Sequence, residues 1–265
     1  MAPSLEHTAI FCRDIDAMLA FYQGLLGGEL IRTAHIASSD TRLGYVQLGE
    51  SVVELLCPRQ ADPARLGLEH IAFSVDDLDG TYGKMKAAGV VFSVPPKAAG
   101  SGVGRVAFFA DPDGIRVELL AQPRFNRPVS ALRMNSHVAD TYSVALRVAD
   151  AARSRAFYER HLGAKHVKQL KVPARKMTLD YLACGRVVLL LVAVEGTEPL
   201  AEKRLQYLAL RVDDVDRTVA DFSRSGVRVA DPPHPAAVGI GRVAVLLDPE
   251  GNRVEILDRP DARRL

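Results

Sequence analysis

Four metal-ligand-type side chains interrupt otherwise apolar stretches in the first half of this 265-residue chain. They are His7, Glu54, His70 and Glu118, and the spacing from His7 to His70 is 63 residues, while that from Glu54 to Glu118 is 64. Imidazole and carboxylate groups bind divalent ions, and four of them leave about two positions of a six-coordinate ion for water or substrate. Open positions indicate catalysis rather than a structural ion. The alternative for either histidine, taken singly, is an ordinary core residue.

Strand alternation predicts that the four side chains share a face. After His70, the apolar residues Ile71 and Phe73 alternate along the chain and point away from the histidine. Glu54 and Glu118 each stand between two apolar neighbours in the same way. A lone carboxylate on an inner face is costly unless it is paired or bound to an ion. We therefore predict one divalent metal ion at this face, and the ligand types suit Ni, Co, Zn, Mn or Fe.

The elements that position these residues recur as a module. Leu5–Ala9 resembles Leu68–Ala72, and a helix capped by Asp14 or Asp77 follows each. Further strands are expected at 29–36, 43–48, 51–57, 90–94, 105–110 and 115–120. Residues 205–209 lie 137 positions after 68–72, so the second half repeats the first. The pattern of each module is strand, helix and three strands.

The modules also carry a family resemblance. Four such modules, the helix end at 21–27 (Phe-Tyr-x-x-x-Leu-Gly) and the Asp-Pro-Asp-Gly turn at 111–114 resemble the vicinal oxygen chelate superfamily of glyoxalases, methylmalonyl-CoA epimerases, extradiol dioxygenases and bleomycin- and fosfomycin-resistance proteins. The resemblance implies an α+β fold in which four βαβββ modules pair into two curved mixed-sheet cup domains. We expect a metal-binding domain at 1–121, a linker at 122–140 and a degenerate domain at 141–259.

The second half lacks most of the ligand set. The counterparts of His7, Glu54 and His70 are predicted to be Ser143, Leu189 and Tyr207, and only Glu255 matches Glu118. We expect Glu255 to make a hydrogen bond or to face solvent. One intact site then requires modules one and two together, within a chain or by exchange between subunits, which leaves a homodimer open.

The resemblance also implies a reaction class. A glyoxalase- or epimerase-like lyase or isomerase chelates adjacent oxygens of a small carbonyl substrate and moves a proton through an enediolate or enolate. In that class Glu118 is the first candidate base and Glu54 the second, with pure ligation as the alternative for both. Tyr45 and Gln47 share a strand face predicted to line the cup, although packing is the alternative for Tyr45. Phe11 stands where glyoxalase I has an arginine for a glutathione carboxylate, and we include it as a candidate substrate contact.

Two other functions compete with this one. An Fe(II)-dependent ring-cleaving dioxygenase would use His7, His70 and Glu118; four modules in one chain favour it, and Glu54 as a fourth ligand counts against it. A protein that sequesters a small molecule is the other alternative. In that case the tyrosines of the second half would line a cup without metal; they are Tyr142, Tyr181 and Tyr207.

The amino-acid composition limits the kinds of molecule that the protein is expected to bind. The formal charge of +2 is spread without a basic run, which argues against binding to nucleic acid or to a membrane surface. Three cysteines far apart in the sequence indicate a reducing compartment, and we expect a cytoplasmic protein without leader or membrane span. A small-molecule substrate is the expected partner.

Overall fold

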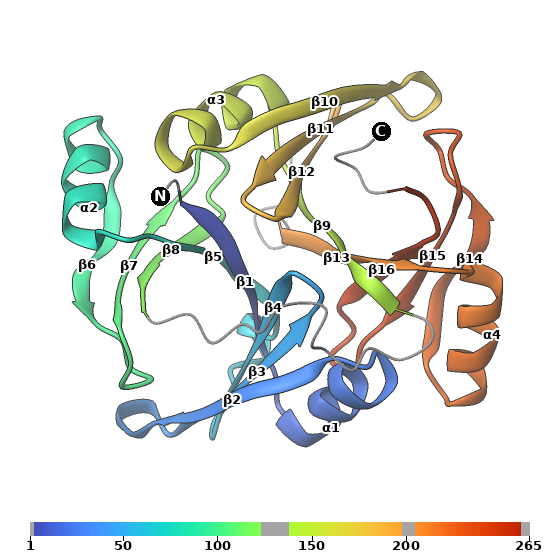
Figure 1. Ribbon diagram of the computed structural model, residues 1–265, viewed down its shortest axis with the longest axis horizontal. Coiled ribbons are helices and arrows are strands. Elements are labelled where there is room, and N and C mark those ends of the chain that lie inside the picture. The colour runs from blue at the N-terminus through green and yellow to red at the C-terminus, as the bar shows by residue number, and fades with distance from the viewer. Residues whose placement is uncertain (1–2, 123–137, 198–204, 261–265) are drawn as a thin grey trace.

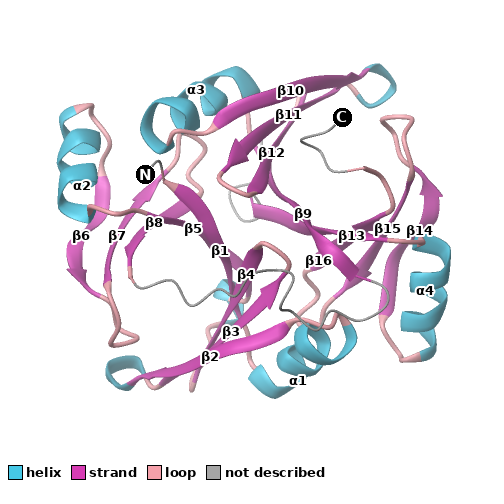
Figure 2. Ribbon diagram, viewed as in Figure 1, coloured by secondary structure: helices cyan, strands magenta, loops and turns pink. Residues whose placement is uncertain are grey.

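The computed structural model describes residues 3–122, 138–197 and 205–260, and its two halves repeat one architecture (Figures 1 and 2). The strands of the first half are β1 Ser4–Phe11, β2 Glu29–Ile36, β3 Thr41–Leu48, β4 Ser51–Pro58, β5 Gly67–Ser74, β6 Phe92–Ala98, β7 Arg105–Ala110 and β8 Arg116–Ala121. Its helical segments are α1 Ile15–Leu19, the π-helical turn η1 Ala20–Leu25, the short 3-10 turns η2 Ala37–Ser39 and η3 Pro63–Arg65, and α2 Leu78–Ala87.

The second half follows the same order. Its strands are β9 Val138–Arg147, β10 Lys165–Val172, β11 Met177–Cys184, β12 Val187–Val194, β13 Leu205–Val212, β14 Arg228–Pro235, β15 Arg242–Leu247 and β16 Arg253–Leu257. Its helical segments are α3 Ala151–Leu162, the 3-10 turn η5 Pro173–Arg175 and α4 Val215–Arg224.

Part of the predicted linker belongs to this second half. β9 begins at Val138, so the last three residues of the segment 122–140 are strand rather than linker, because Val138 and Asp140 pair with β13. Residues 123–137, which make up most of that segment, lie outside the described residues.

Each half forms one eight-stranded mixed sheet. The order in the first is β2-β3-β4-β1-β5-β8-β7-β6, and the second has the equivalent order β10-β11-β12-β9-β13-β16-β15-β14. The two modules of a half meet at an antiparallel pair, β1 with β5 or β9 with β13, and each central strand is flanked by a parallel partner. Modules one and two therefore build one sheet within the chain, and the α+β cup fold is confirmed.

The predicted helix starts are confirmed. The Asp14 carboxylate accepts hydrogen bonds from two backbone amides in the first turn of α1, and that of Asp77 accepts one from the Gly80 amide of α2. Gly27 ends the first helical segment at a φ of 73°, a left-handed conformation that favours glycine. These capped helices pack on one face of the first sheet and leave the other face for the cup (Figure 1).

A continuous apolar core joins the two halves. It contains the residues that alternation predicted to face the helices, including Phe73 and Val117, together with equivalents from the second sheet. Two matching hydrogen bonds cross between the halves: the Tyr22 hydroxyl donates to Asp248 at 3.0 Å, and the Tyr158 hydroxyl donates to Asp111 at 2.8 Å. Within the described residues, no helix is long and apolar enough to cross a membrane.

Candidate active site

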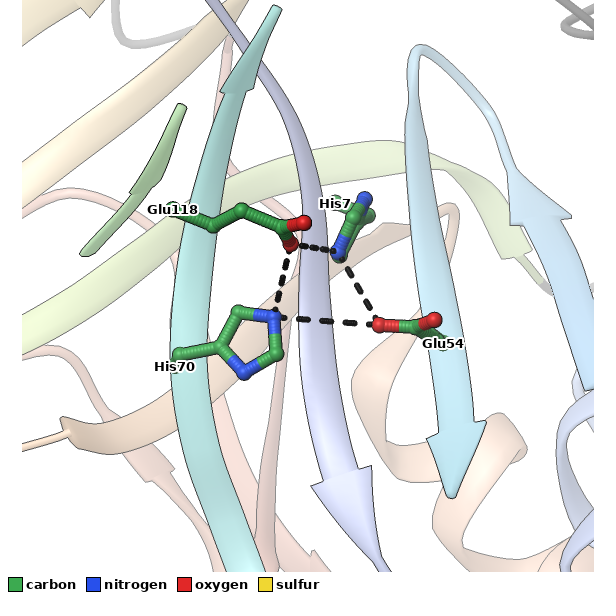
Figure 3. Close-up of side chains that lie close together, drawn as sticks. All are labelled: His7, Glu54, His70 and Glu118. Atoms are coloured by element: carbon green, nitrogen blue, oxygen red, sulfur yellow. Dashed lines mark hydrogen bonds and ion pairs between the residues drawn. The ribbon is translucent and has the colours of Figure 1, made fainter. Parts of the chain in front are cut away.

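Four neighbouring strands bring the four predicted ligand residues together. His7 lies on β1, Glu54 on β4, His70 on β5 and Glu118 on β8, and all four side chains are buried. One donor atom from each lies within 4.8 Å of every other (Figure 3). The adjacency of β4, β1, β5 and β8 in the sheet explains how residues more than a hundred positions apart converge.

The four donor atoms surround a common centre. The Nε2 atom of His7 lies 3.1 Å from Oε2 of Glu54 and 3.3 Å from Oε2 of Glu118. The Nε2 atom of His70 lies 3.0 Å from Glu118 and 3.7 Å from Glu54. His7 Nε2 is buried and makes no well-aligned hydrogen bond despite these short distances. A buried nitrogen without a hydrogen bond, facing two carboxylates and a second imidazole, fits a divalent ion.

The electrostatics of the centre favour a cation. Burial alone would lower the pKa of His70, but Glu118 and Glu69 raise it to about 9. His7 behaves alike, because Glu54, Glu6 and Glu118 outweigh its burial and raise its pKa well above the ordinary value. Burial opposes the charge on Glu118, yet the two histidines hold its pKa low, at about 2. Positive charge is therefore stabilised here, whether it is carried by protons or by an ion.

Two glutamates that sequence reasoning did not assign complete the centre. Glu6 Oε2 lies 2.5 Å from Nδ1 of His7, and Glu69 Oε2 contacts Nδ1 of His70 in the same way. The Glu-His pair occurs in both of the similar segments 5–9 and 68–72, and that repetition was the available signal. Alternation alone places each glutamate on the opposite face from its histidine, which is why the signal was missed.

A cavity of about 250 Å³ opens over the four donors. Tyr45 lines it as predicted, and pairs across the sheet with Glu54. Burial and the neighbouring Glu54 carboxylate raise the pKa of the Tyr45 hydroxyl, so it stays protonated and able to donate a hydrogen bond. Arg32 lies over the Tyr45 ring, 5.2 Å from its centroid.

The structure does not bring the other two predicted substrate contacts to this cavity. Gln47 lies two residues beyond Tyr45, but its buried side-chain amide donates to the Gly49 carbonyl at 3.0 Å. Phe11 packs against the apolar cluster that includes Tyr45 and Leu56 but does not itself reach the cavity, and the guanidinium of Arg65 lies 4.5 Å from its ring centroid. Neither residue belongs to the cavity lining.

Other lining residues had no signal in the sequence. The apolar part of the wall includes Leu56, Val106 and Phe108, and the Phe108 ring meets the His70 ring edge-on at 5.5 Å. Lys97 supplies a cation to the same cavity. Residues 99–101, in the turn between β6 and β7, also contribute to the wall.

The strand pairing of the second sheet corrects the predicted counterpart of Glu54. Tyr45 pairs with Glu54, and the equivalent Tyr181 pairs with Leu190 rather than with Leu189. Leu190 belongs to the apolar cluster of the second cup, whereas Leu189 belongs to the shared core on the helix side. The predicted counterpart of Glu54 was therefore wrong by one residue, and a one-residue shift moves a strand side chain to the opposite face.

These observations define a class: a two-domain protein of paired βαβββ modules with a candidate divalent-metal centre in its first cup. Comparison with protein families agrees. The chain belongs to the family described as Glyoxalase/Bleomycin resistance protein/Dioxygenase superfamily, whose model matches residues 4–119 and again 137–256.

Several curated relatives are named as lyases. The chain is 26% identical to a probable chloroplastic lactoylglutathione lyase of Arabidopsis thaliana over 96% of its own length and 73% of the relative. It is 25% identical to the lactoylglutathione lyase of Schizosaccharomyces pombe over 96% of both chains. A probable lactoylglutathione lyase of Synechocystis is 34% identical over 44% of this chain and 93% of its own.

Solved structures share the fold. The Mn(II)-bound glyoxalase from Novosphingobium aromaticivorans has a TM-score of 0.71 at 18% identity and covers 97% of this chain and 82% of its own. The 2,3-dioxygenase LapB from a Pseudomonas species has a TM-score of 0.68 at 17% identity and covers 98% and 95%. At these sequence identities the similarity establishes the fold alone, and the reaction must be inferred from the residues of the site.

Proposed function

We propose that the protein is a divalent-metal-dependent lyase or isomerase whose ligands are His7, Glu54, His70 and Glu118. The observation that carries the proposal is the convergence of four buried donors at the base of a cavity. Two imidazoles and two carboxylates suit Ni, Co, Zn, Mn or Fe. The names of the relatives support the lyase class.

The residues around the centre suit proton transfer next to a carbonyl group. When bound, the ion would polarise adjacent oxygens of a substrate and make a neighbouring carbon-bound proton more acidic. Glu118 and Glu54 each turn one oxygen toward the imidazoles and the other away (Figure 3). We assign Glu118 as the first candidate for the base that removes and returns the proton, and Glu54 as the second. The Tyr45 hydroxyl lies on the same wall and would orient a substrate oxygen.

The two competing functions fit the site less well. In a dioxygenase site of two histidines and one carboxylate, Glu54 would be superfluous, yet its Oε2 atom lies 3.1 Å from His7 Nε2. A sequestering protein would not need four buried ionisable groups at the base of its cavity, because such groups are costly to bury. The lyase or isomerase class uses all four.

The relatives suggest the first compound to test. Several are named for lactoylglutathione, a thioester with a hydroxyl group next to its carbonyl. Phe11 and its Arg65 neighbour lie outside the cavity, and no arginine is among the described residues that line it, so this part of the site lacks the arginine expected for a glutathione carboxylate. We therefore infer a small carbonyl compound with adjacent oxygens and leave the thiol carrier open.

Solvent exchange tests the reaction class. The metal-loaded protein is incubated in deuterium oxide without oxygen, together with lactoylglutathione or with a panel of α-hydroxycarbonyl compounds. We expect deuterium at the carbon next to the carbonyl, and loss of this exchange on chelation. Oxygen uptake with catechols and a stoichiometric iron content, without any exchange, would contradict the proposal and favour the dioxygenase.

A further inference from the structure

The glutamate before each candidate ligand histidine occupies a β-bulge. One register shift in the β1–β5 pair falls between Leu5 and His7 and leaves Glu6 as the extra residue of β1. A second shift leaves Glu69 as the extra residue of β5, directly before His70. A bulge turns a residue that would otherwise point to the opposite face toward its neighbour's side. Both glutamates thereby reach the histidine that follows them.

The contacts use the nitrogen that does not face the centre. Glu6 contacts Nδ1 of His7 at 2.5 Å, and Glu69 contacts Nδ1 of His70. In each ring the other nitrogen, Nε2, is the atom directed at the carboxylates of Glu54 and Glu118. The Glu6 and Glu69 side chains are only 11% and 13% exposed, so water competes little for these hydrogen bonds.

The two contacts are supported differently. Arg116 pairs with Glu69, and its guanidinium lies 4.1 Å from the centroid of the Phe108 ring. Arg65 adds a longer ion pair to the same carboxylate at 3.7 Å. Within the described part of the chain, no arginine or lysine forms an ion pair with Glu6. Glu69 is therefore held from two sides, whereas Glu6 depends on its bulge and on His7.

The second sheet has the same two bulges without carboxylates in them. Its β9–β13 pair has register shifts at the equivalent places, where the extra residues are Tyr142 and Gln206. Ser143 and Tyr207 follow them in place of histidines. The bulges thus belong to the shared fold and do not require a Glu-His contact. A carboxylate occurs at both bulge positions in the sheet that has the candidate metal centre.

We propose that Glu6 and Glu69 are positioning residues, which accept the Nδ1 protons of His7 and His70 and thereby fix both Nε2 atoms as metal ligands. This inference rests on the proposed metal site. A carboxylate on the second nitrogen fixes the tautomer and orientation of a ligand histidine and makes it a better donor, and its removal costs roughly 10- to 100-fold in metal affinity.

Cobalt binding tests the proposal without reference to a substrate. Co(II) is titrated into the metal-free wild type and into Glu6→Ala, Glu69→Ala and Glu69→Gln, with visible absorption as the readout. We expect the Kd to rise by roughly 10- to 100-fold in both alanine variants and by less in Glu69→Gln, which keeps a hydrogen-bond acceptor. Gln206→Ala removes the equivalent bulge residue of the second sheet and should leave the Kd unchanged.

The outcomes separate this inference from the proposed function. If the wild type does not bind Co(II), the metal site itself is wrong and both fail. If the wild type binds and both alanine variants bind equally well, only the positioning role is overturned. Thermal unfolding of the metal-free proteins shows whether each variant is folded. If Glu69→Ala fails to fold, Glu6→Ala still tests the proposal, because it disrupts no ion pair with an arginine.

Nuclear magnetic resonance of the Zn(II)-loaded protein supplies a second readout. In the wild type, each ligand histidine should show an Nδ1 proton that exchanges slowly with water. Glu69→Ala should abolish the His70 signal and retain that of His7, and Glu6→Ala should do the reverse. A merely structural role would not affect one ring selectively. Retention of both signals in both variants would therefore overturn the proposal.

Discussion

The two cups of this protein have the same backbone and opposite chemistry. The first contains His70 and Glu54 among its four buried donors, below a cavity. The second contains Tyr207 and Leu190 at equivalent register positions, within an apolar cluster. Strand order is the same in both, and so are the two bulges directly before the positions of His7 and His70. The fold therefore supplies positions, and the side chains at those positions decide whether a cup can hold an ion.

One matched position shows the difference. Histidines hold the pKa of Glu118 at about 2, against the effect of its burial. At the equivalent Glu255, burial raises the pKa in spite of Arg259 and Arg253 nearby. Arg259 is itself buried in the second cup, where its guanidinium lies 4.7 Å from the centroid of the Tyr142 ring. The same residue type is thus held charged in one cup and shifted toward its neutral form in the other.

The largest expected effect contrasts these two glutamates. Glu118→Gln removes a proposed ligand and the first candidate base, so we expect kcat for solvent exchange to fall by roughly 10²- to 10⁴-fold. Glu255→Gln should leave kcat within about twofold, because it lies in the cup without the ligand set. Steady-state exchange rates of the two metal-loaded variants provide the measurement. Equal losses in both would show that the cups are not functionally distinct.

A graft into the second cup sharpens the comparison. Ser143→His, Leu190→Glu and Tyr207→His, combined with the native Glu255, reproduce the donor types of the first cup. We expect a second ion per chain by elemental analysis after dialysis against Co(II). The same graft with Leu189→Glu in place of Leu190→Glu should not bind it, because Leu189 faces the core on the helix side.

The grafted site should be weaker than the native one. Its bulge residues are Tyr142 and Gln206, which lack a carboxylate for Nδ1 of the new histidines. Arg259 also places a positive charge in that cup. We expect a Kd at least about tenfold higher than that of the native site. An equal affinity would mean that the ligand set alone is sufficient.

A smaller effect concerns the hydrogen bonds that join the halves. Burial raises the pKa of Asp111 from 3.8 to about 6, although the Tyr158 hydroxyl lowers it in part. The unfolded chain loses this proton near pH 3.8, whereas the folded protein keeps it to about pH 6. The Asp111 contribution to the free energy of unfolding therefore falls as pH rises through that window, by on the order of 3 kcal/mol.

Urea unfolding at pH 4 and pH 7 measures this contribution. Asp111→Asn removes the ionisable group, so the variant should gain stability relative to the wild type as the pH rises. The exposed Asp79→Asn serves as the control, because the hydrogen bond from Arg105 lowers the pKa of Asp79, so that group gives no loss of stability as the pH rises. An unchanged difference between wild type and Asp111→Asn across the window would contradict the role assigned to the Asp111 burial.

Much of this arrangement could be predicted from the sequence. The predicted strands 29–36 and 105–110 match β2 and β7, because turn residues and alternation mark both ends. The two histidines and two glutamates could be placed on one face by the same alternation, and the structure brings them together. Comparing the repeated modules showed that only modules one and two contain the full ligand set, and their pairing could be deduced from this.

The rest depends on geometry that alternation does not contain. Glu6 and Glu69 reach their histidines only because each stands in a bulge, and no residue type signals the bulge. Gln47 lies on the predicted face, but its amide bonds a nearby carbonyl instead of reaching the cavity. The contact of Tyr22 with Asp248 joins residues 226 positions apart in different halves, which local patterns cannot reveal.

Metal content tests the central claim most directly. Purified wild-type protein is loaded with Co(II), dialysed and measured by elemental analysis beside His70→Ala and Tyr207→Ala, the equivalent positions of the two cups. We expect a single tightly bound ion in the wild type and in Tyr207→Ala, and loss of that ion in His70→Ala. An ion retained in His70→Ala, or none in the wild type, would contradict the assignment of the first cup as the metal centre.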